Sequence, residues 1–419
     1  MLQHNAIAVA RITCALIVLV TSASAASKER VLHNFSSGKG GHSPIQGVIF
    51  DGAGNVYGVT TYGGNHENGG TVYKLSQGPN GSWTETVLYD FCSVENCVDG
   101  AGPFGNLIFD GAGNLYGTTV GGGTAEGGTV FELTPDGNGA WTETVLHSFT
   151  GEPQDGFAPY AGVIMDTDGN VYGTTSVGGA SGAGIAFELS TAGNGSWTET
   201  VLHNFCSAPH CADGMNPYGG LTLDAAGVLY GMTYQGGDAD QGAVFELSRN
   251  NGTWQETVLQ SFDGTDGAGP EGDLIFDSAG NLFGATAYGG DMACDKPVGC
   301  GAIFELQQAN NKWTESVLHV FYVYPKNPSS TLVFDSSGNL YGTTLSGGEY
   351  GGGVLFKLTK AQNGTWATTA VFSFREPLGD DPVGFLTFDS SGNLYGSAQN
   401  GGKFNNCYQA CGVIFEITP

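Results

Sequence analysis

Short apolar and aromatic runs alternate along the chain with clusters of Gly, Asn and Asp. Between residues 105 and 149 the runs cover 106–109, 114–119, 129–133 and 141–149. β-Branched and aromatic runs that are bounded by turn residues predict strands. The periodicity of an amphipathic helix is missing from this pattern. The sequence therefore predicts a unit of four antiparallel strands, called A to D in chain order.

This unit recurs along the chain. Versions of F-D-x-x-G-N-L-Y-G follow one another at spacings of 53 to 59 residues, with aspartates at Asp51, Asp110, Asp166, Asp224, Asp277, Asp335 and Asp389. A fixed period of this length indicates an array of one small unit. Seven units of four strands are what a β-propeller requires. We predict that residues 26–419 form one all-β domain, a seven-bladed β-propeller with four antiparallel strands in each blade.

The two ends of the chain predict how the ring closes. The strand D motif, E-T-V-L-H-x-F, stands at 85–91, 143–149, 199–205, 256–262, 315–321 and, in degraded form, 368–374. The last repeat has no such segment after it, but a copy stands at 29–35. A closed ring explains this displacement, because the N-terminal strand then completes the last blade and leaves no exposed sheet edge at the seam.

The first 25 residues differ from the repeats. Arg11 precedes an apolar run at 12–20, and Ala23-Ser24-Ala25 follows it. This pattern is typical of a secretory signal peptide, cleaved near Ala25. The run is short for a membrane span, so an N-terminal anchor helix is the less favoured alternative. We expect a secreted protein, extracellular or periplasmic, that is a monomer without a membrane span in the mature chain.

Cysteine spacing supports export. Apart from Cys14, the cysteines form the close pairs Cys92 and Cys97, Cys206 and Cys211, Cys294 and Cys300, and Cys407 and Cys411. An even number of cysteines in tight local pairs, in an exported chain, predicts disulfides. The alternative, zinc, needs four converging ligands, and only His210 lies beside any pair.

The net charge of −27 argues against nucleic acid as a partner, because its phosphates require a basic surface. The acidic composition raises the question of calcium, for which carboxylates are ligands. The alternative for the D-x-x-G-N aspartates is that they accept turn amides, while Gly and Asn adopt left-handed conformations. We favour the turn interpretation and predict no cofactor, with calcium as the open possibility.

The strand order separates two faces of the predicted ring. With strand A at the axis and strand D outermost, the short A–B and C–D turns share one face. The longer, variable B–C and D–A loops share the other, which we call the loop face. All four cysteine pairs fall in its loops. Because variable loops on a rigid scaffold commonly carry binding sites, the loop face is the candidate site.

The candidate ligand-binding residues come from these loops. The D–A loops carry Asp-Gly or Asp-Asp pairs that could surround the channel and bind cations or hydroxyl-rich ligands, although they could equally cap turns. Tyrosines in the B–C loops could stack on sugars. The strand D histidines, in contrast, lie too far apart to share one ion. The candidates are Tyr62, His66, Asp99, Asp155, Asp213, Tyr234, Asp266, Tyr288 and Asp381.

The repeat G-x-L-x-F-D-x-x-G-N-L-Y-G-T-T-x-x-G-G resembles the GloVer tandem repeat of the bacterial choice-of-anchor tandem repeat GloVer-containing proteins. The resemblance covers nearly all of the mature chain and implies export or surface display, without an established activity. The chain shows no sorting or membrane tail before Pro419, so we expect free secretion. The D-x-x-G-N-L-Y element also looks like blades of bacterial lyases and lactonases, at the level of the fold.

The sequence contains no Ser-His-Asp order, H-E-x-x-H, P-loop or dinucleotide-binding motif. We therefore assign no catalytic residue and no metal ligand. The favoured hypothesis is a binding module for a polysaccharide or an extracellular or cell-envelope protein, acting through the loop face. The alternative is a cation-dependent lyase or hydrolase with its site on the same face near the axis.

Overall fold

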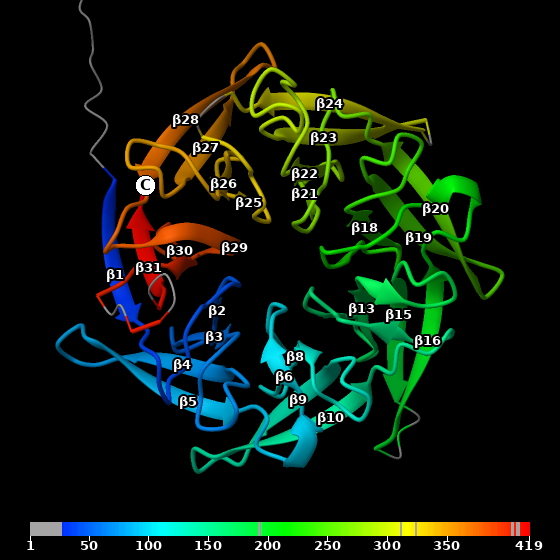
Figure 1. The fold of residues 1–419 in the computed structure, drawn as a ribbon. Helices are drawn as coiled ribbons and strands as arrows, with labels where there is room; N and C mark the ends of the chain where they lie inside the picture. The colour runs from blue at the N-terminus through cyan, green and yellow to red at the C-terminus, as the bar shows by residue number, and fades with distance from the viewer. Residues whose placement is uncertain are drawn as a thin grey trace, which may run out of the picture.

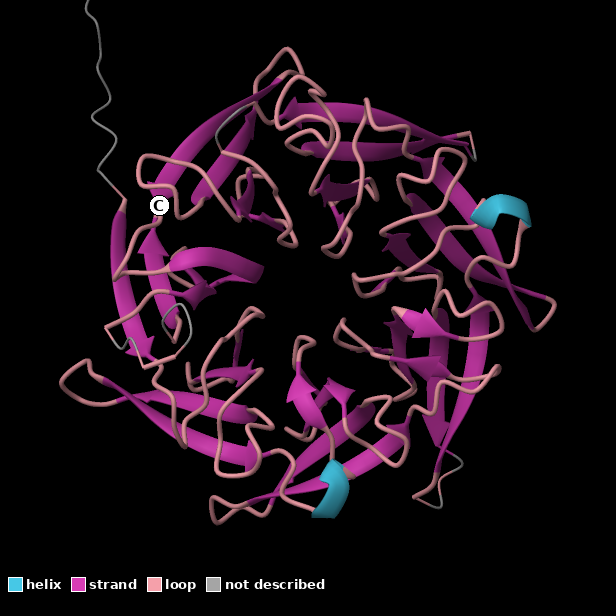
Figure 2. Cartoon of the chain, in the orientation of Figure 1, coloured by secondary structure: helices cyan, strands magenta, loops and turns pink. Residues whose placement is uncertain are grey.

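The computed structural model describes residues 27–191, 193, 195–310, 312–322, 325–403, 406–407 and 411–419. The predicted signal peptide at 1–25 lies outside them. Strands dominate this part of the chain, and its two short 3-10 helices are η1 (Glu95–Cys97) and η2 (Pro209–Cys211) (Figure 2). Within the same residues, no helix has the length and apolar character needed to cross a membrane.

Seven antiparallel sheets stand around a ring (Figure 1), which confirms the predicted propeller. The first three blades contain β2 (Ile49–Phe50), β3 (Val56–Thr60), β4 (Thr71–Gln77) and β5 (Trp83–Asp90); β6 (Ala101–Pro103), β7 (Ile108–Phe109), β8 (Leu115–Gly121), β9 (Thr129–Pro135) and β10 (Trp141–Ser148); β12 (Ile164–Met165), β13 (Val171–Thr175), β15 (Ile185–Thr191) and β16 (Trp197–Asn204). Beside the third blade, β11 (Gly156–Phe157) pairs with β14 (Val177–Gly178).

The next three blades repeat the same order, from the inner strand outward. They contain β17 (Thr222–Leu223), β18 (Leu229–Thr233), β19 (Ala243–Asn250) and β20 (Thr253–Ser261); β21 (Ile275–Phe276), β22 (Leu282–Thr286), β23 (Ala302–Ala309) and β24 (Lys312–Val320); β25 (Val333–Phe334), β26 (Leu340–Thr344), β27 (Val354–Lys360) and β28 (Trp366–Ser373).

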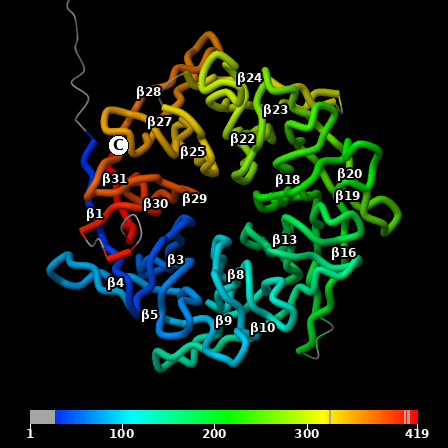
Figure 3. The backbone as a smooth tube through the Cα atoms, in the orientation of Figure 1, coloured from blue at the N-terminus to red at the C-terminus, as the bar shows by residue number. Residues whose placement is uncertain are grey.

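The seventh blade joins the two ends of the chain. It contains β29 (Asp380–Phe388), β30 (Leu394–Asn400), β31 (Val413–Thr418) and, as its outermost strand, β1 (Lys28–Asn34). β1 runs antiparallel to β31 from the pair Lys28 and Thr418 to the pair Asn34 and Val413. Figure 3 shows this blue segment beside the red end of the chain. The predicted closure by residues 29–35 is confirmed.

Aromatic contacts join every blade to the next. The Phe that follows each strand D packs edge-on or tilted against an aromatic ring in strand C of the following blade, with ring centroids 5.0–5.3 Å apart. The pairs are Phe35–Tyr73, Phe91–Phe131, Phe149–Phe187, Phe205–Phe245, Phe262–Phe304, Phe321–Phe356 and Phe374–Phe415. The first of these pairs lies at the seam, so the seam is packed like the other boundaries.

The D-x-x-G-N segments are hairpin turns held by their aspartates. Asp51 Oδ1 accepts the backbone N–H groups of Ala53 and Asn55, both at 2.9 Å, and its Oδ2 accepts Asn55 Nδ2 and the Tyr57 hydroxyl. Although burial opposes them, these hydrogen bonds lower the pKa of Asp51. The backbone part of the pattern recurs at the other six aspartates.

The turn interpretation is therefore confirmed, with one correction. Only the glycine of each turn is left-handed, with φ between 78° and 90°. The expectation that the asparagine also adopts this conformation is wrong, since Asn55 uses its side-chain amide to donate to Asp51 instead.

Truncation of the seam aromatic tests ring closure. Phe35 is 1% exposed, and Phe149 holds the equivalent place at an internal boundary with 0% exposed. Both Phe35→Ala and Phe149→Ala should lower the free energy of unfolding by about 3–5 kcal/mol, because each leaves a cavity in a packed core. Urea denaturation measures both. Closure by β1 would be contradicted if Phe35→Ala lowered the free energy of unfolding by less than about 1 kcal/mol while Phe149→Ala lowered it by the expected amount.

Candidate functional site

A cavity of about 510 Å³ lies where all seven blades meet, and each blade contributes to its lining. Most of its walls come from the ends of the D–A loops, just before the inner strands. Its lining is Ile45, Gln46, Phe104, Asn106, Tyr160, Ala161, Gly162, Tyr218, Tyr234, Glu271, Gly272, Asp273, Ser329, Thr331, Leu345, Val383, Gly384 and Gln399. We call this the central cavity. Its volume is within the range of small-molecule sites.

A proline positions each wall segment. In every blade a proline before or within the inner segment packs against a glycine of the preceding blade; Pro103 lies in β6 and Pro382 in β29. A Cβ built on Gly128, for example, would lie only 2.8 Å from Cδ of Pro159, and the φ of Gly128 is +92°. The contact therefore requires glycine. The prolines are Pro44, Pro103, Pro159, Pro217, Pro270, Pro328 and Pro382.

The residue after this proline lines the central cavity in every blade, and it takes six residue types over the seven blades, with Tyr in two neighbouring blades. In chain order these residues are Ile45, Phe104, Tyr160, Tyr218, Glu271, Ser329 and Val383. The packing around these residues repeats from blade to blade, but the residue type does not stay constant. A position that serves only the scaffold would be free to carry one residue type throughout, as the turn aspartates do. The variation makes the central cavity asymmetric.

Aromatic rings form one side of the central cavity. Ring centroids are 5.0 Å apart for Phe104 and Tyr160, 5.4 Å for Tyr160 and Tyr218, and 5.1 Å for Tyr218 and Tyr234. All three pairs are edge-to-face, the arrangement that the ring quadrupoles favour. We call these four residues the aromatic wall. Burial, together with the neighbouring Tyr288, raises the pKa of Tyr234 to about 12.

Two carboxyl groups follow the aromatic wall around the ring. Burial raises the pKa of Glu271 to about 7, and no hydrogen bond or ion pair holds its carboxylate among the described residues. Asp273 is tied into the wall, because its Oδ1 accepts the Gly220 N–H at 2.6 Å and its own N–H donates to Thr331 Oγ1 at 2.9 Å. Burial also raises the pKa of Asp273.

Side-chain hydroxyls lock neighbouring wall segments together. Thr118 donates to the carbonyl of Ala161 at 2.8 Å, and Thr174 donates to that of Gly219 at 2.9 Å. At the seam, Ser397 donates to the carbonyl of Gln46 at 2.7 Å. Each bond crosses from one blade to the next, so the walls are positioned before any ligand arrives.

The structure separates the tyrosines and the histidine that the sequence suggested. Tyr234 lies in the central cavity, and Tyr288 is its neighbour. Tyr62 is 46% exposed and its ring packs against His42 with centroids 5.8 Å apart, outside the cavity lining. His66 is exposed in the loop beside Cys92 and Asn96.

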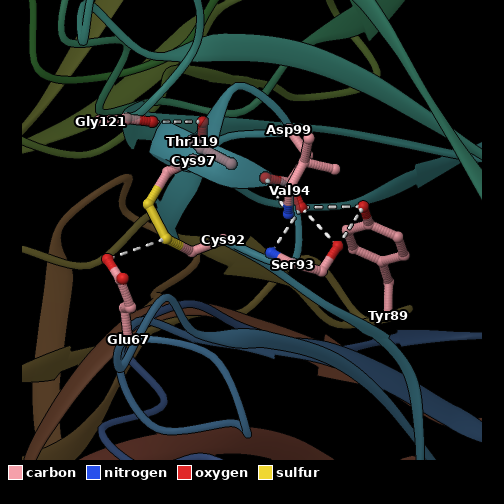
Figure 4. Close-up of a disulfide and its surroundings, with 9 residues drawn as sticks. All are labelled: Glu67, Tyr89, Cys92, Ser93, Val94, Cys97, Asp99, Thr119 and Gly121. Carbon is pink, nitrogen blue, oxygen red and sulfur yellow. Dashed lines mark hydrogen bonds between the residues drawn. A yellow bond between two sulfur atoms is a disulfide. The ribbon is translucent and has the colours of Figure 1, made fainter.

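Four of the five predicted aspartates follow the outer strands and close their own D–A loops, whereas Asp381 lies in the inner strand β29. Asp99 Oδ2 accepts the Ser93 N–H and hydroxyl and the Tyr89 hydroxyl (Figure 4). Asp155, Asp213 and Asp266 are held by hydrogen bonds of the same kind. The place of Tyr89 is taken by His147 beside Asp155, by His203 beside Asp213 and by Gln260 beside Asp266. Asp381 accepts Asn400 Nδ2 at 2.7 Å. None of the five lines the central cavity, and a role in ligand binding stays a prediction for them.

All four predicted disulfides are formed: Cys92–Cys97, Cys206–Cys211, Cys294–Cys300 and Cys407–Cys411. Cys92–Cys97 spans η1 beside the Asp99 network (Figure 4). The bonds fix loops at the periphery of the loop face, away from the lining of the central cavity.

Glutamates in strand D form a second unusual set. Burial raises the pKa of each to about 7, and in each at least one carboxylate oxygen is buried without a hydrogen bond among the described residues; they are Glu29, Glu143, Glu199, Glu256 and Glu315. Glu199 belongs to blade three but faces His147 of blade two, 3.9 Å away. With Asp155 these two form a group that could hold a metal ion. This group lies at a blade boundary, outside the central cavity.

Sequence reasoning missed Phe104, Tyr160, Tyr218, Glu271 and Asp273. The signal was present, however. When the repeats are aligned on the D–A proline instead of on F-D-x-x-G-N, the following position carries six different residue types in seven blades.

Comparison with known proteins places the chain in a family. Residues 18–152, 139–323 and 296–419 match the sequence model of the Gloeobacter/Verrucomicrobia repeat. The chain belongs to this family. The family description agrees with the resemblance noted from the repeat, but it assigns no ligand. No curated protein matches the sequence.

Solved structures share the fold. A proposed 6-phosphogluconolactonase from Bacteroides uniformis is 14% identical, with a TM-score of 0.51, over 85% of this chain and 89% of that one. Its counterpart from Bacteroides fragilis is 16% identical, with a TM-score of 0.51, over 85% and 88%. A protein from Lactobacillus plantarum is 16% identical, with a TM-score of 0.53, over 90% and 100%. Identities this low show a shared propeller fold.

The five strand D glutamates with a raised pKa predict how the stability of the fold depends on pH. Their ordinary pKa is 4.5, and in the folded protein it is about 7. Between these values the folded state holds more protons than the unfolded chain, so stability falls as pH rises. Burial lowers the pKa of His42, His203 and His319, which opposes this trend, but Glu271 adds to the glutamates and these six carboxyls outnumber the histidines. The Tm should therefore fall by several degrees from about pH 5 to pH 8.

A single variant checks the cause. Glu143→Gln should make the fall in Tm shallower and raise the Tm at pH 8, because it removes one buried charge. Glu152→Gln, at an exposed loop position, is the matched control and should change neither. Differential scanning calorimetry across the pH series gives both quantities. A Tm that rises steadily with pH would contradict the assignment.

Proposed function

We propose that the protein is a secreted binding module that recognises a polysaccharide through the central cavity of its loop face. One observation carries the proposal. The residue after each D–A proline lines the central cavity and takes six different identities over the seven blades, while the packing around it repeats. Export is supported by the four disulfides, which persist in oxidising compartments.

The chemistry of the lining suits a sugar chain. Tyrosine offers an apolar face and a polar hydroxyl, so the aromatic wall can pack on the C–H face of a sugar while its hydroxyls bond to the sugar hydroxyls. Asn106, Gln46 and Gln399 add amide donors and acceptors around the same space. A protein partner, by comparison, buries about 800 Å² on each side. A concave site of about 510 Å³ fits a narrow chain better than a protein surface.

A second candidate, a lyase or hydrolase, has one observation in its favour. Glu271 has a pKa near 7 and stands two residues from Asp273 in the same cavity. A carboxyl group that titrates near the working pH suits general acid–base catalysis. A phosphorylated substrate, as the names of the two Bacteroides proteins suggest for them, is disfavoured, because the described lining contains no Lys, Arg or His to bind phosphate.

Cavity variants test the binding function. An affinity-gel screen first identifies a polysaccharide that retards the mature protein. Tyr160→Ala and Tyr218→Ala should each weaken binding to this polysaccharide by at least about tenfold, or about 1.4 kcal/mol. Tyr350→Ala is the matched control, because Tyr350 is 50% exposed and lies outside the central cavity. It should leave binding unchanged. Thermal melts confirm that all three variants are folded.

The proposal would be wrong if no polysaccharide bound, or if the cavity variants bound as tightly as the unaltered protein. Chain length distinguishes the enzyme candidate. A binding module leaves the polysaccharide unchanged after prolonged incubation, as size-exclusion chromatography would show. If the unaltered protein shortens the polysaccharide and the Glu271→Gln variant does not, the protein is an enzyme and the proposed binding function is wrong.

A further inference from the structure

We infer that the ligand of the central cavity carries a free amine, and that a polysaccharide containing amino sugars binds with an ammonium group between the aromatic wall and Glu271. This inference rests on the proposed polysaccharide-binding function and names its ligand class. It is carried by three features of the central cavity: its charge, its rings and an unpartnered carboxylate.

The charge of the lining has one sign. Glu271 and Asp273 are its titratable acids, and the described lining contains no Lys, Arg or His. The whole chain has a net charge of −27, so its field attracts cations and repels anions. An acidic or phosphorylated sugar would meet repulsion without compensation. A cationic sugar is attracted over a distance and then neutralises the carboxylates where it binds.

The rings and the carboxylates belong to one site. Burial raises the pKa of Tyr218, and the neighbouring Tyr160 and Glu271 raise it further. Glu271 also contributes to the raised pKa of Tyr234, so its carboxyl group lies near both tyrosine side chains. Aromatic rings attract cations through their quadrupoles, more strongly where water is displaced. An ammonium group at this place would gain from the rings and the carboxylate together.

Glu271 lacks the partners that other carboxylates of the loops have. Asp99 accepts hydrogen bonds from its own loop, and Asp273 accepts the Gly220 N–H. Glu271 has no such contact among the described residues, although it is half-buried in the cavity wall. An unpaired carboxyl in such a place is costly when it is charged. An ammonium group has three N–H donors and would supply the missing partners.

A lysine side chain of a protein would carry the same ammonium group. The aromatic wall favours the sugar, because it extends over Phe104, Tyr160, Tyr218 and Tyr234 and offers its rings to a broad ligand body. The slender chain of lysine would leave most of this surface uncovered. Polylysine therefore serves as a competing ligand in the test.

Isothermal titration calorimetry of the mature protein tests the inference with matched oligosaccharides. The probes are β-1,4-linked glucosamine oligomers, the same oligomers fully N-acetylated, β-1,4-linked glucose oligomers of equal length, and polylysine. The glucosamine oligomers should bind at least about tenfold more tightly than each of the others, and added salt should weaken them most. Equal binding of the free-amine and acetylated forms would overturn the inference, as would equal or tighter binding of polylysine.

Variants test whether Glu271 is the carboxylate that binds the amine. Glu271→Gln should reduce the affinity for glucosamine oligomers by about tenfold, the loss expected for one hydrogen-bonded ion pair. It should fold, because the amide has nearly the same shape and lacks the buried charge. Glu152→Gln, an exposed loop position, makes the same change of charge and should leave binding unaltered. Unchanged affinity in Glu271→Gln would overturn the assignment of Glu271.

The outcomes also separate this inference from the proposed function. If the acetylated or glucose oligomers bind through Tyr160 and Tyr218 and the amine form does not, polysaccharide binding stands and selection for the amine is wrong. If none of the oligomers bind, the inference is wrong, and the affinity-gel screen with other polysaccharides decides the proposed function separately.

Discussion

The structure depends on one contact that recurs at each blade boundary, the packing of the Phe after strand D against an aromatic ring of the next blade. A single blade cannot bury both of its faces, so each blade is stable only between two neighbours. The array therefore has to end in caps or close. It closes through Phe35 and Tyr73, with β1 completing the last blade.

Closure has a functional consequence. Once the ring is fixed, the seven segments after the D–A prolines converge on one central cavity, and hydroxyl groups such as those of Thr118 and Thr174 hold adjacent segments together. The variable position after each proline, together with Tyr234 and Asp273, gives the cavity an aromatic side and an acidic side. Rigid walls also reduce the conformational entropy that the protein loses when a ligand binds.

The fold was predictable from the sequence because its determinants repeat. The turn aspartates, the strand D motif and the displaced copy at 29–35 gave blade number and closure, and close spacing gave the cysteine pairs. The site was predictable only in part. Of the predicted candidates, Tyr234 lines the central cavity, whereas Asp99, Asp155, Asp213 and Asp266, which were proposed because they lie on the loop face, hold their own loops. Tyr160 and Glu271 follow the equivalent proline in different blades, and what brings them together is the convergence of segments distant in sequence.

The central claim is that the cavity on the axis, between the aromatic wall and Glu271, is where a sugar ligand binds. The most direct measurement is a crystal structure of the mature protein soaked with a glucosamine oligosaccharide. The account predicts a sugar ring against Tyr160 and Tyr218, with its amine nitrogen within hydrogen-bonding distance of the Glu271 carboxylate. An oligosaccharide bound at the outer loops around Tyr62 and His66, with the central cavity left empty, would contradict it.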